Sequence, residues 1–326
     1  MQSDNEPVLL APGGQSRPRS HLGQFAPLAV LAALLAAVGS VEPSFLSPYS
    51  LGVLADESSV TLLLAAAQTI VILLGGIDLS MAAVASLASV LIALVLPSAG
   101  FAGLVSVLAL TGLIGAIHGL IHVRGQIPSF VVTLAALGVW SGVALTIAHS
   151  TIQITAGYSV IGWLQHSNFG VPTSFCFALA AVIILAFALR RLPLGRYIYA
   201  IGLAERAALL SGIRVGRVKI IGFALTGLFS GLAGMMMVAR TSSGSPTIAD
   251  SLLLPSIAAV VIGGTSVTGG VGGLGRTLIG VLTITVLRLG IAAFGFDPAY
   301  EPMAYGFLVV AAAALTVDRS KLPIAK

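Results

Sequence analysis

Residues 190–219 read RRLPLGRYIYAIGLAERAALLSGIRVGRVK and interrupt a chain that is otherwise almost continuously apolar. Seven of the sixteen Lys and Arg residues fall in these thirty positions. Inside the stretch, the Ala- and Leu-rich residues 203–211 predict a short helix that Gly212 ends in a left-handed conformation. A chain that spans a membrane rarely keeps thirty ordered residues outside it without a contact to make. The stretch therefore predicts a cytoplasmic partner protein.

The composition on either side of this stretch predicts a membrane protein. Of the 326 residues, 57% are hydrophobic and 8% are charged, and the mean hydropathy is +1.05. So little charge cannot cover the surface of a soluble domain. Because a spanning helix needs about 20 predominantly apolar residues, we expect an all-α polytopic membrane protein with about ten transmembrane helices. The predicted spans are 25–41, 51–74, 80–96, 101–122, 128–148, 173–190, 217–239, 252–264, 274–293 and 302–317, of which 252–264 is short.

The basic residues predict the orientation, because Lys and Arg concentrate on the cytoplasmic side of a membrane protein. With a cytoplasmic N-terminus, only Arg240 and Arg288 of the sixteen lie at outer helix ends. The chain then divides into a cytoplasmic tail at 1–24, a transmembrane region at 25–317 and a cytoplasmic tail at 318–326. The net charge of +5 reflects this orientation, since a nucleic-acid surface needs a folded basic face. The predicted outer loops hold Glu42, Asp56, Glu57, Asp250, Asp297 and Glu301.

Two stretches break the apolar pattern at membrane depth, GGIDLS at 75–80 and GGTSVTGG at 263–270. Paired glycines cost a helix roughly 2 kcal/mol relative to alanine, and the freed backbone needs protein or a water-filled cavity around it. Asp78 either caps the next helix with Ser80 or belongs to a transport path, as an intramembrane acid often does. The residues assigned to the breaks are Gly75, Gly76, Asp78, Ser80, Gly263, Gly264 and Thr265.

Four further polar residues lie in predicted spans: Gln68, Thr69, Thr133 and Ser256. Each either contacts a transported molecule or bonds the backbone of a neighbouring helix, and the second interpretation is the simpler one. The single cysteine, Cys176, can form no internal disulfide and is expected to be a buried apolar thiol.

The motifs of catalysis and nucleotide binding are missing or incomplete. Gly270, Gly275 and Arg276 imitate a phosphate-binding loop, but the motif requires a preceding strand and a lysine in place of the arginine. His118 and His122 share a helix face without a carboxylate or thiol that would complete a zinc site. We therefore expect no enzyme, metal or cofactor in this chain. A secondary transporter driven by an ion gradient is the alternative kind of protein, although it should carry several intramembrane carboxylates.

Four stretches carry a resemblance to a known family. They are GGIDLS at 75–80, HGLIHVRGQIPSFVVTLAAL at 118–137, GRYIYAIGLAERAALLSGI at 195–213 and IAAVVIGGTSVTGG at 257–270. In order and separation they resemble the ribose-type sugar permeases of the ATP-binding-cassette (ABC) importers, which include xylose, arabinose, galactose and autoinducer-2 permeases. The resemblance covers about residues 25–317. The chain departs from the family pattern at His118, where Asn is usual, and at Leu203-Ala204, where Gly-Asn is usual.

The resemblance implies the ABC importer transmembrane-domain fold, with ten helices per subunit and both termini cytoplasmic. It implies import of a pentose- or hexose-like sugar across the bacterial inner membrane by alternating access. The implied partners are ATPase subunits that bind ATP and Mg, a periplasmic binding protein, a second permease copy or paralogue, and membrane lipid, but no nucleic acid. Residues 203–213 are similar to the coupling helix that docks on the ATPase. The residues assigned to this contact are Gly195, Arg196, Leu203, Ala204, Glu205, Arg206, Ala207, Ala208, Leu209, Ser211, Gly212 and Ile213.

Overall fold

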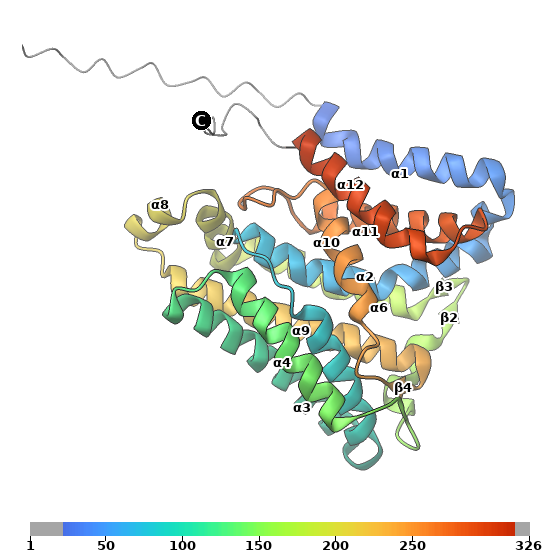
Figure 1. Cartoon of the computed structure of the whole chain (residues 1–326), viewed down its shortest axis with the longest axis horizontal. Helices are drawn as coiled ribbons and strands as arrows, with labels where there is room; N and C mark the ends of the chain where they lie inside the picture. Colours follow the sequence, from blue (N-terminus) through green and yellow to red (C-terminus); the bar gives the residue numbers. More distant parts are fainter. Residues whose placement is uncertain (1–21, 317–326) are drawn as a thin grey trace, which may run out of the picture.

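The computed structural model describes residues 22–316, with side chains described for residues 25–310, and it is built almost wholly from helices (Figure 1). Within the described residues, every predicted span lies on a helix to within about two residues at each end. Residues 1–21 of the predicted tail at 1–24 and the whole predicted tail at 318–326 lie outside the described residues, with Arg17, Arg19, Arg319, Lys321 and Lys326. Residues 22–24 belong to the first helix. The helices are α1 (Leu22–Val41), α2 (Pro48–Leu73), α3 (Met81–Gly125), α4 (Ser129–Ile147), α5 (Ser159–Gly162), α6 (Thr173–Arg191), α7 (Pro193–Leu203), α8 (Glu205–Leu210), α9 (Val215–Thr241), α10 (Leu253–Ile262), α11 (Leu274–Ala293) and α12 (Glu301–Thr316).

Six of the described helices are long and apolar enough to cross a membrane, namely α2, α3, α4, α6, α9 and α11. The longest, α3, contains two predicted spans, 80–96 and 101–122. It is bent between them at Gly100, whose φ of 51° and ψ of −132° are not helical. Its two arms therefore run as separate helices. Helix α10 has only ten residues, in agreement with its short apolar run.

Helix α2 forms the centre of the molecule. Every residue from 58 to 73 is buried, and α2 packs against α6, α9, α10 and α11. By contrast, α4 and α6 bury one side only. On α6 the buried positions form a stripe with Ser174, Ala178 and Val182, and Cys176 lies off that stripe and is exposed. The prediction of a buried thiol was wrong, because α6 covers the core with a single face.

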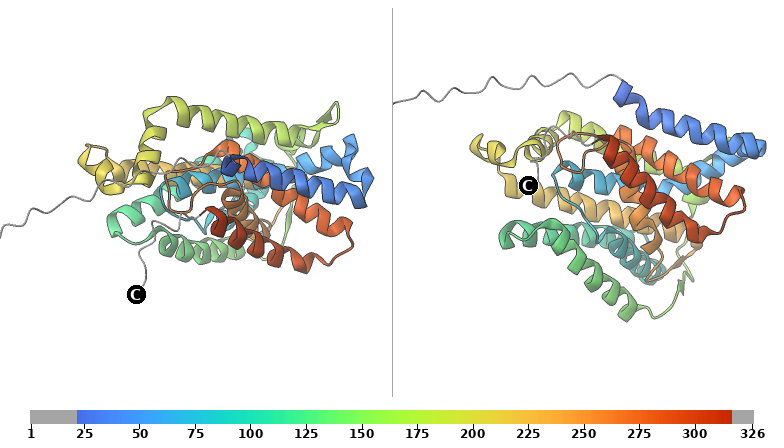
Figure 2. Two further views of the ribbon diagram at one scale, coloured as in Figure 1. Left: turned by 90° about the horizontal axis from the view of Figure 1, so that it is seen from above. Right: turned by 45° about the horizontal axis from the view of Figure 1, so that its top comes forward.

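Short elements mark the two ends of the molecule. Strand β1 (Ile152–Gln153) pairs antiparallel with β4 (Ser243–Gly244), and β2 (Ser167–Asn168) pairs antiparallel with β3 (Val171–Pro172). These strands lie at one end, here called the strand end, and α8 projects at the opposite end, here called the α8 end (Figures 1 and 2). The long helices run between the two ends.

Residues 190–219 contain two helices where one was expected. Pro193 starts α7 at a position where a missing N–H costs nothing. Leu203 belongs to α7, and Ala204, with a φ of −161°, separates it from α8. The short helix is therefore Glu205–Leu210, two residues shorter at its start than predicted. Gly212 follows it with a φ of +80°, in the left-handed region that the sequence predicted.

Candidate functional site

The two breaks and the end of α7 meet at one point. A Cβ added to Gly202 would lie 1.9 Å from the Leu73 carbonyl oxygen and 2.3 Å from the Gly270 nitrogen. The Gly270 N–H donates to the same Leu73 oxygen at 2.9 Å. A Cβ on Gly269 would lie 2.9 Å from the Gly75 nitrogen. We call the contact of Gly75, Gly202, Gly269 and Gly270 the glycine junction. Backbone packs directly on backbone here, so no larger residue fits at Gly202.

A side chain of α7 strengthens this contact. The Tyr199 hydroxyl donates to the Gly272 carbonyl oxygen at 3.2 Å, and Gly272 lies two residues after the second break. Burial raises the pKa of the Tyr199 phenol, which keeps its donor proton in place. Helix α7 is thus tied to the second break by a hydrogen bond as well as by packing.

Helix α4 holds the backbone of the first break. The Ile77 N–H donates to the Ser129 hydroxyl at 3.2 Å, and the Thr133 hydroxyl donates to the Ile77 carbonyl oxygen at 3.2 Å. Both backbone polar groups of Ile77 are therefore satisfied by protein. Thr133 also donates to its own helix, at the Ser129 carbonyl oxygen. These hydrogen bonds explain why a polar residue stands at position 133.

A buried chain of hydrogen bonds leads away from Asp78. One carboxylate oxygen of Asp78 accepts from the Ser80 N–H at 2.8 Å and from the Ser80 hydroxyl at 2.6 Å. Trp140 Nε1 donates to His118 Nε2 at 2.8 Å. Because Nε2 accepts, the proton of the neutral imidazole is on Nδ1, which lies 3.3 Å from the Ser80 hydroxyl and donates to it. The chain joins the start of α3 to its second arm and to α4.

The second break is held by a hydrogen bond between a side chain within it and the backbone that follows it. The Gly273 N–H donates to the Thr265 hydroxyl at 3.3 Å, which closes the loop between α10 and α11. Gly264 has a φ of +85°, and a Cβ on Gly263 would lie 2.4 Å from the Arg276 carbonyl oxygen. Ser256 donates to the Leu252 carbonyl oxygen of its own helix at 2.8 Å. The glycines therefore permit both the turn and the close approach of α11.

Thr69 and Gln68 are neighbours on α2 with different surroundings. The Thr69 hydroxyl bonds the Ala65 carbonyl oxygen and lies 2.7 Å from the Thr277 hydroxyl of α11. Gln68 is completely buried, and neither polar atom of its amide has a hydrogen-bond partner among the described residues. Thr69, Thr133 and Ser256 thus all bond backbone, but Thr69 and Ser256 bond the backbone of their own helix, whereas that of a neighbouring helix had been expected. For Gln68 that expectation was wrong.

At the α8 end, the predicted coupling residues divide between inward and outward positions. Ala208 is buried, and a Cβ on Gly195 would lie 1.8 Å from the Leu189 carbonyl oxygen at the end of α6. The apolar side chains of Leu203, Leu209 and Leu210 are 67%, 62% and 89% exposed. An apolar edge of this size on a short projecting helix is typical of a contact surface.

A cavity of about 250 Å³ lies between α8 and the first break. Its lining includes the backbone turn at Gly75 and Gly76, the His122 ring, and the ion pair of Glu205 and Lys219. Among the residues that the structure describes, no group of three or more His, Cys, Asp and Glu side chains gathers as a metal site would require.

Comparison with known proteins identifies the kind of protein that carries this arrangement. Residues 50–313 match the family model described as the permease component of the branched-chain amino acid transport system. The chain belongs to this permease family. The permease is 37% identical to the ribose import permease of Bacillus subtilis (strain 168), over 92% of this chain and 93% of that protein. It is 34% identical to the fructose import permease of Rhizobium meliloti (89% and 84%) and 32% identical to the D-allose transport system permease of Escherichia coli K12 (88% and 89%). No solved structure matches.

The matches extend over nearly the whole length of the relatives, so the permease has the same kind of role as they do. It is a multi-pass permease subunit of the bacterial inner membrane, and it is not itself an enzyme. The resemblance to ribose-type permeases that its motifs suggested is confirmed.

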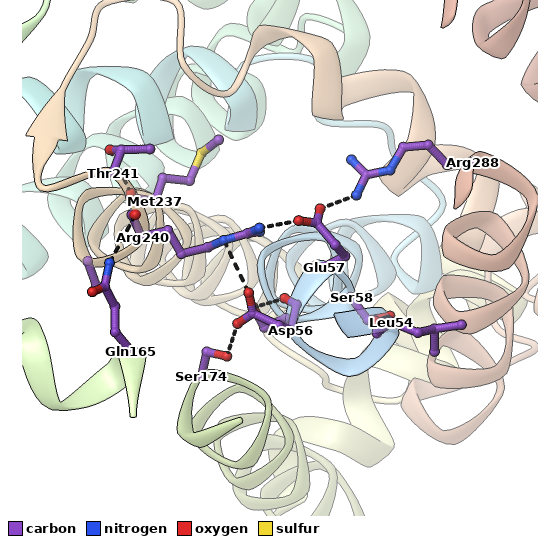
Figure 3. Close-up of polar contacts among 12 residues, drawn as sticks. Leu54, Asp56, Glu57, Ser58, Gln165, Ser174, Met237, Arg240, Thr241 and Arg288 are labelled. Atoms are coloured by element: carbon purple, nitrogen blue, oxygen red, sulfur yellow. Dashed lines mark hydrogen bonds and ion pairs between the residues drawn. The ribbon is translucent and has the colours of Figure 1, made fainter. Parts of the chain in front are cut away.

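The permease also carries a charge cluster that the sequence did not predict (Figure 3). Asp56 and Glu57 were assigned to an outer loop although the predicted span 51–74 includes them, and the structure places both in α2. Glu57 accepts from both Arg240 of α9 and Arg288 of α11. Asp56 lies 3.5 Å from the Arg240 side chain and accepts from the Ser174 hydroxyl. The cluster ties α2, α6, α9 and α11 together near the strand end.

The missed residues share one property: their partners are distant in sequence. Ser129, His118 and Trp140 act on the first break from α3 and α4, and Gly202 contacts breaks that lie far from it in the chain. A local signal was available only for α7, because a proline that follows an apolar helix predicts a new helix start.

Proposed function

We propose that the permease is the transmembrane subunit of an ATP-driven ABC importer for a sugar or sugar-like molecule of the pentose or hexose class. The glycine junction carries the mechanistic part of the proposal, because it joins residues 190–219 to both intramembrane breaks. The cargo class is supported by the relatives, which are named as ribose, fructose and D-allose permeases. Specificity among sugars then belongs to a separate periplasmic binding protein.

In the proposed topology ten helices span the inner membrane and both termini are cytoplasmic. The spans are the two arms of α3 together with α1, α2, α4, α6, α9, α10, α11 and α12. The α8 end is cytoplasmic, because it gathers the basic side chains of residues 190–219. The strand end then faces the periplasm and the binding protein.

Helix α8 is proposed to dock on the partner ATPase, which binds ATP and Mg; the permease itself needs no cofactor. The exposed Leu209 and Leu210 supply an apolar contact, and Arg196 and Arg206 supply positive charge beside it. When ATP closes the ATPase dimer, α8 moves with it. The motion reaches α7 and then the two breaks through the glycine junction, and the subunit opens toward the strand end.

The break residues Gly75, Gly76, Asp78, Ser80, Gly263, Gly264 and Thr265 are proposed to be the part of the permease that rearranges. A second permease copy or a paralogue completes the pathway. The one-sided burial of α4 and α6 supports this, since their free faces need either lipid or a neighbouring subunit. The proposed partners do not include nucleic acid.

Uptake into proteoliposomes tests the proposed function. The permease, reconstituted with its ATPase and binding-protein partners, should accumulate radiolabelled D-ribose, D-fructose or D-allose only when ATP and Mg are supplied to the ATPase. A protonophore or a collapsed sodium gradient should leave this uptake unchanged. Uptake that follows an ion gradient without ATP would instead make the permease a secondary transporter.

A further inference from the structure

Gln68 of α2 has a buried side-chain amide. Neither its nitrogen nor its oxygen has a hydrogen-bond partner among the described residues. The side chain is 0% exposed and lies in a stretch of α2 with no exposed residue. Buried amides in folded proteins are nearly always hydrogen-bonded, so an unpaired one calls for an explanation. The neighbouring Thr69 and the equally buried Thr226 both have partners, at Thr277 and at Ala67.

Gln68 continues a polar stripe that begins at the strand end. Glu57, Thr61 and Gln68 stand at positions i, i+4 and i+11 of α2, and steps of four and seven residues keep side chains on one helix face. Thr61 lines a small cavity of about 40 Å³. Gln68 lies seven residues further along the axis, which places it about 10 Å deeper. The cavity thus ends above Gln68 in this conformation.

The walls of that cavity come from α2, α10, α11 and α12, and the strand-end cluster holds two of these helices, α2 and α11, together. Thr285 and Arg288 of α11 face Glu301 and Tyr305 of α12 across it. Arg288 is bound to Glu57, and the Tyr305 hydroxyl donates to Glu301 at 2.9 Å. Opening toward the strand end would separate α2 from α10 and α11, on which it packs, and it would extend the cavity along the stripe to Gln68.

We propose that Gln68 binds hydroxyl groups of the sugar when the permease opens toward the strand end. An amide presents one acceptor and two donors, which match neighbouring hydroxyls of a sugar. It carries no charge, so it binds such a cargo weakly enough to release it. In the closed state the amide has no alternative partner among the described residues, and the closed state is therefore less favourable than it would be with an apolar residue there. The inference rests on the proposed function and adds a cargo contact to it.

The first test measures the accessibility of position 68 and depends on no particular sugar. Because the chain has one cysteine, Cys176→Ser gives a background in which Gln68→Cys is the only thiol. A small charged methanethiosulfonate reagent should label that thiol slowly in the resting complex. After trapping with ATP and vanadate, labelling should be about tenfold faster or more, and imported sugar in excess should slow it again.

Ser230→Cys in the same background is the matched control. Ser230 is equally buried on α9 and bonds its own helix at the Thr226 carbonyl oxygen. It should stay unreactive in both states. Equal labelling rates at position 68 in the resting and trapped complexes would overturn the inference, whereas a complex that neither hydrolyses ATP nor imports sugar would overturn the proposed function itself.

The second test asks whether the Gln68 amide binds the cargo or only lowers the stability of the folded permease. Gln68→Leu should keep or raise Tm and should raise the KM for uptake of the transported sugar about tenfold. Ser230→Ala should leave KM unchanged. The inference fails if Gln68→Leu leaves uptake intact, and it also fails if the variant lowers Tm, since the amide would then be part of the folded framework.

Discussion

Lys219 of α9 donates from Nζ to Glu205 Oε1 of α8 at 2.7 Å, and this ion pair fastens the projecting helix to a long one. The Lys219 side chain is 13% exposed and the Glu205 side chain 53%. Lys219 also stands near the N-terminus of α9, where the helix dipole disfavours a cation. The carboxylate of Glu205 therefore faces α9 and stabilises Lys219.

The first prediction concerns this pair. Glu205→Lys should reduce ATP-driven uptake strongly, because two cations repel each other and α8 loses its tie to α9. Exposed ion pairs contribute about 0–1 kcal/mol to stability, so Tm and membrane insertion should change little. Adding Lys219→Glu should restore uptake by recreating the pair with its charges exchanged. If the double variant stays inactive, Glu205 acts on the ATPase directly.

The second prediction concerns the glycine junction. Gly202→Ala should destabilise the permease by about 1–3 kcal/mol or more, because the new Cβ would lie 1.9 Å from the Leu73 carbonyl oxygen. The backbone of Leu73 and that of Gly270 flank this position, and neither can shift without a large cost in free energy. Thermal unfolding in detergent measures the effect.

Gly138→Ala is the matched control for Gly202→Ala. Nothing lies within 4 Å of a Cβ added at Gly138 in α4, so alanine should be neutral there or add about 0.5–1 kcal/mol of helix stability. Equal Tm values for the two variants would show that the junction tolerates a side chain.

The third prediction concerns Asp78. Asp78→Ala removes the acceptor of two hydrogen bonds from Ser80. The free energy of unfolding should fall by about 1.5–3 kcal/mol for each of these bonds, the usual contribution of a hydrogen bond to a charged group. Asp78→Asn keeps an oxygen in place and should retain most of the Tm and of the assembly with partners. If Asp78→Asn assembles normally but loses uptake, the charge of Asp78 serves transport and is not needed for folding.

The fourth prediction concerns the strand-end cluster. Glu57→Gln leaves Arg240 and Arg288 without their shared carboxylate and should destabilise the permease by about 1.5–3 kcal/mol, because the three side chains are only partly exposed. Arg288→Met in the Glu57→Gln background should recover part of the lost Tm, since one unpaired charge is removed. A Tm that falls further in the double variant would show that Arg288 has a second essential partner.

The positions of the helices could be predicted from the sequence because they depend on local composition. Runs of about 20 apolar residues mark the long helices, and Gly212 marks the end of α8 because few other residues adopt its φ of +80°. The bend of α3 at Gly100 follows from the same property. These features involve residues that are neighbours in the chain.

The contacts of the candidate site could not be predicted in the same way. Glu57 and Arg288 are separated by 231 positions, and Ile77 and Ser129 by 52. Gly202 looks like any other glycine until the helices that surround it are placed. Gln68 was recognised as an unusual polar residue, but only the packing shows that its amide differs from the hydroxyls of Thr69 and Thr133, which bond backbone.

The α8 end and the strand end lie at opposite extremes of the molecule, and this distance has an evolutionary consequence. Substitutions near Gln68 or the strand-end cluster leave the surface of α8 untouched. A descendant of this permease can therefore be adapted to another cargo and its binding protein while it keeps the same ATPase. Conversely, one ATPase can serve several paralogous permeases that share the surface of α8.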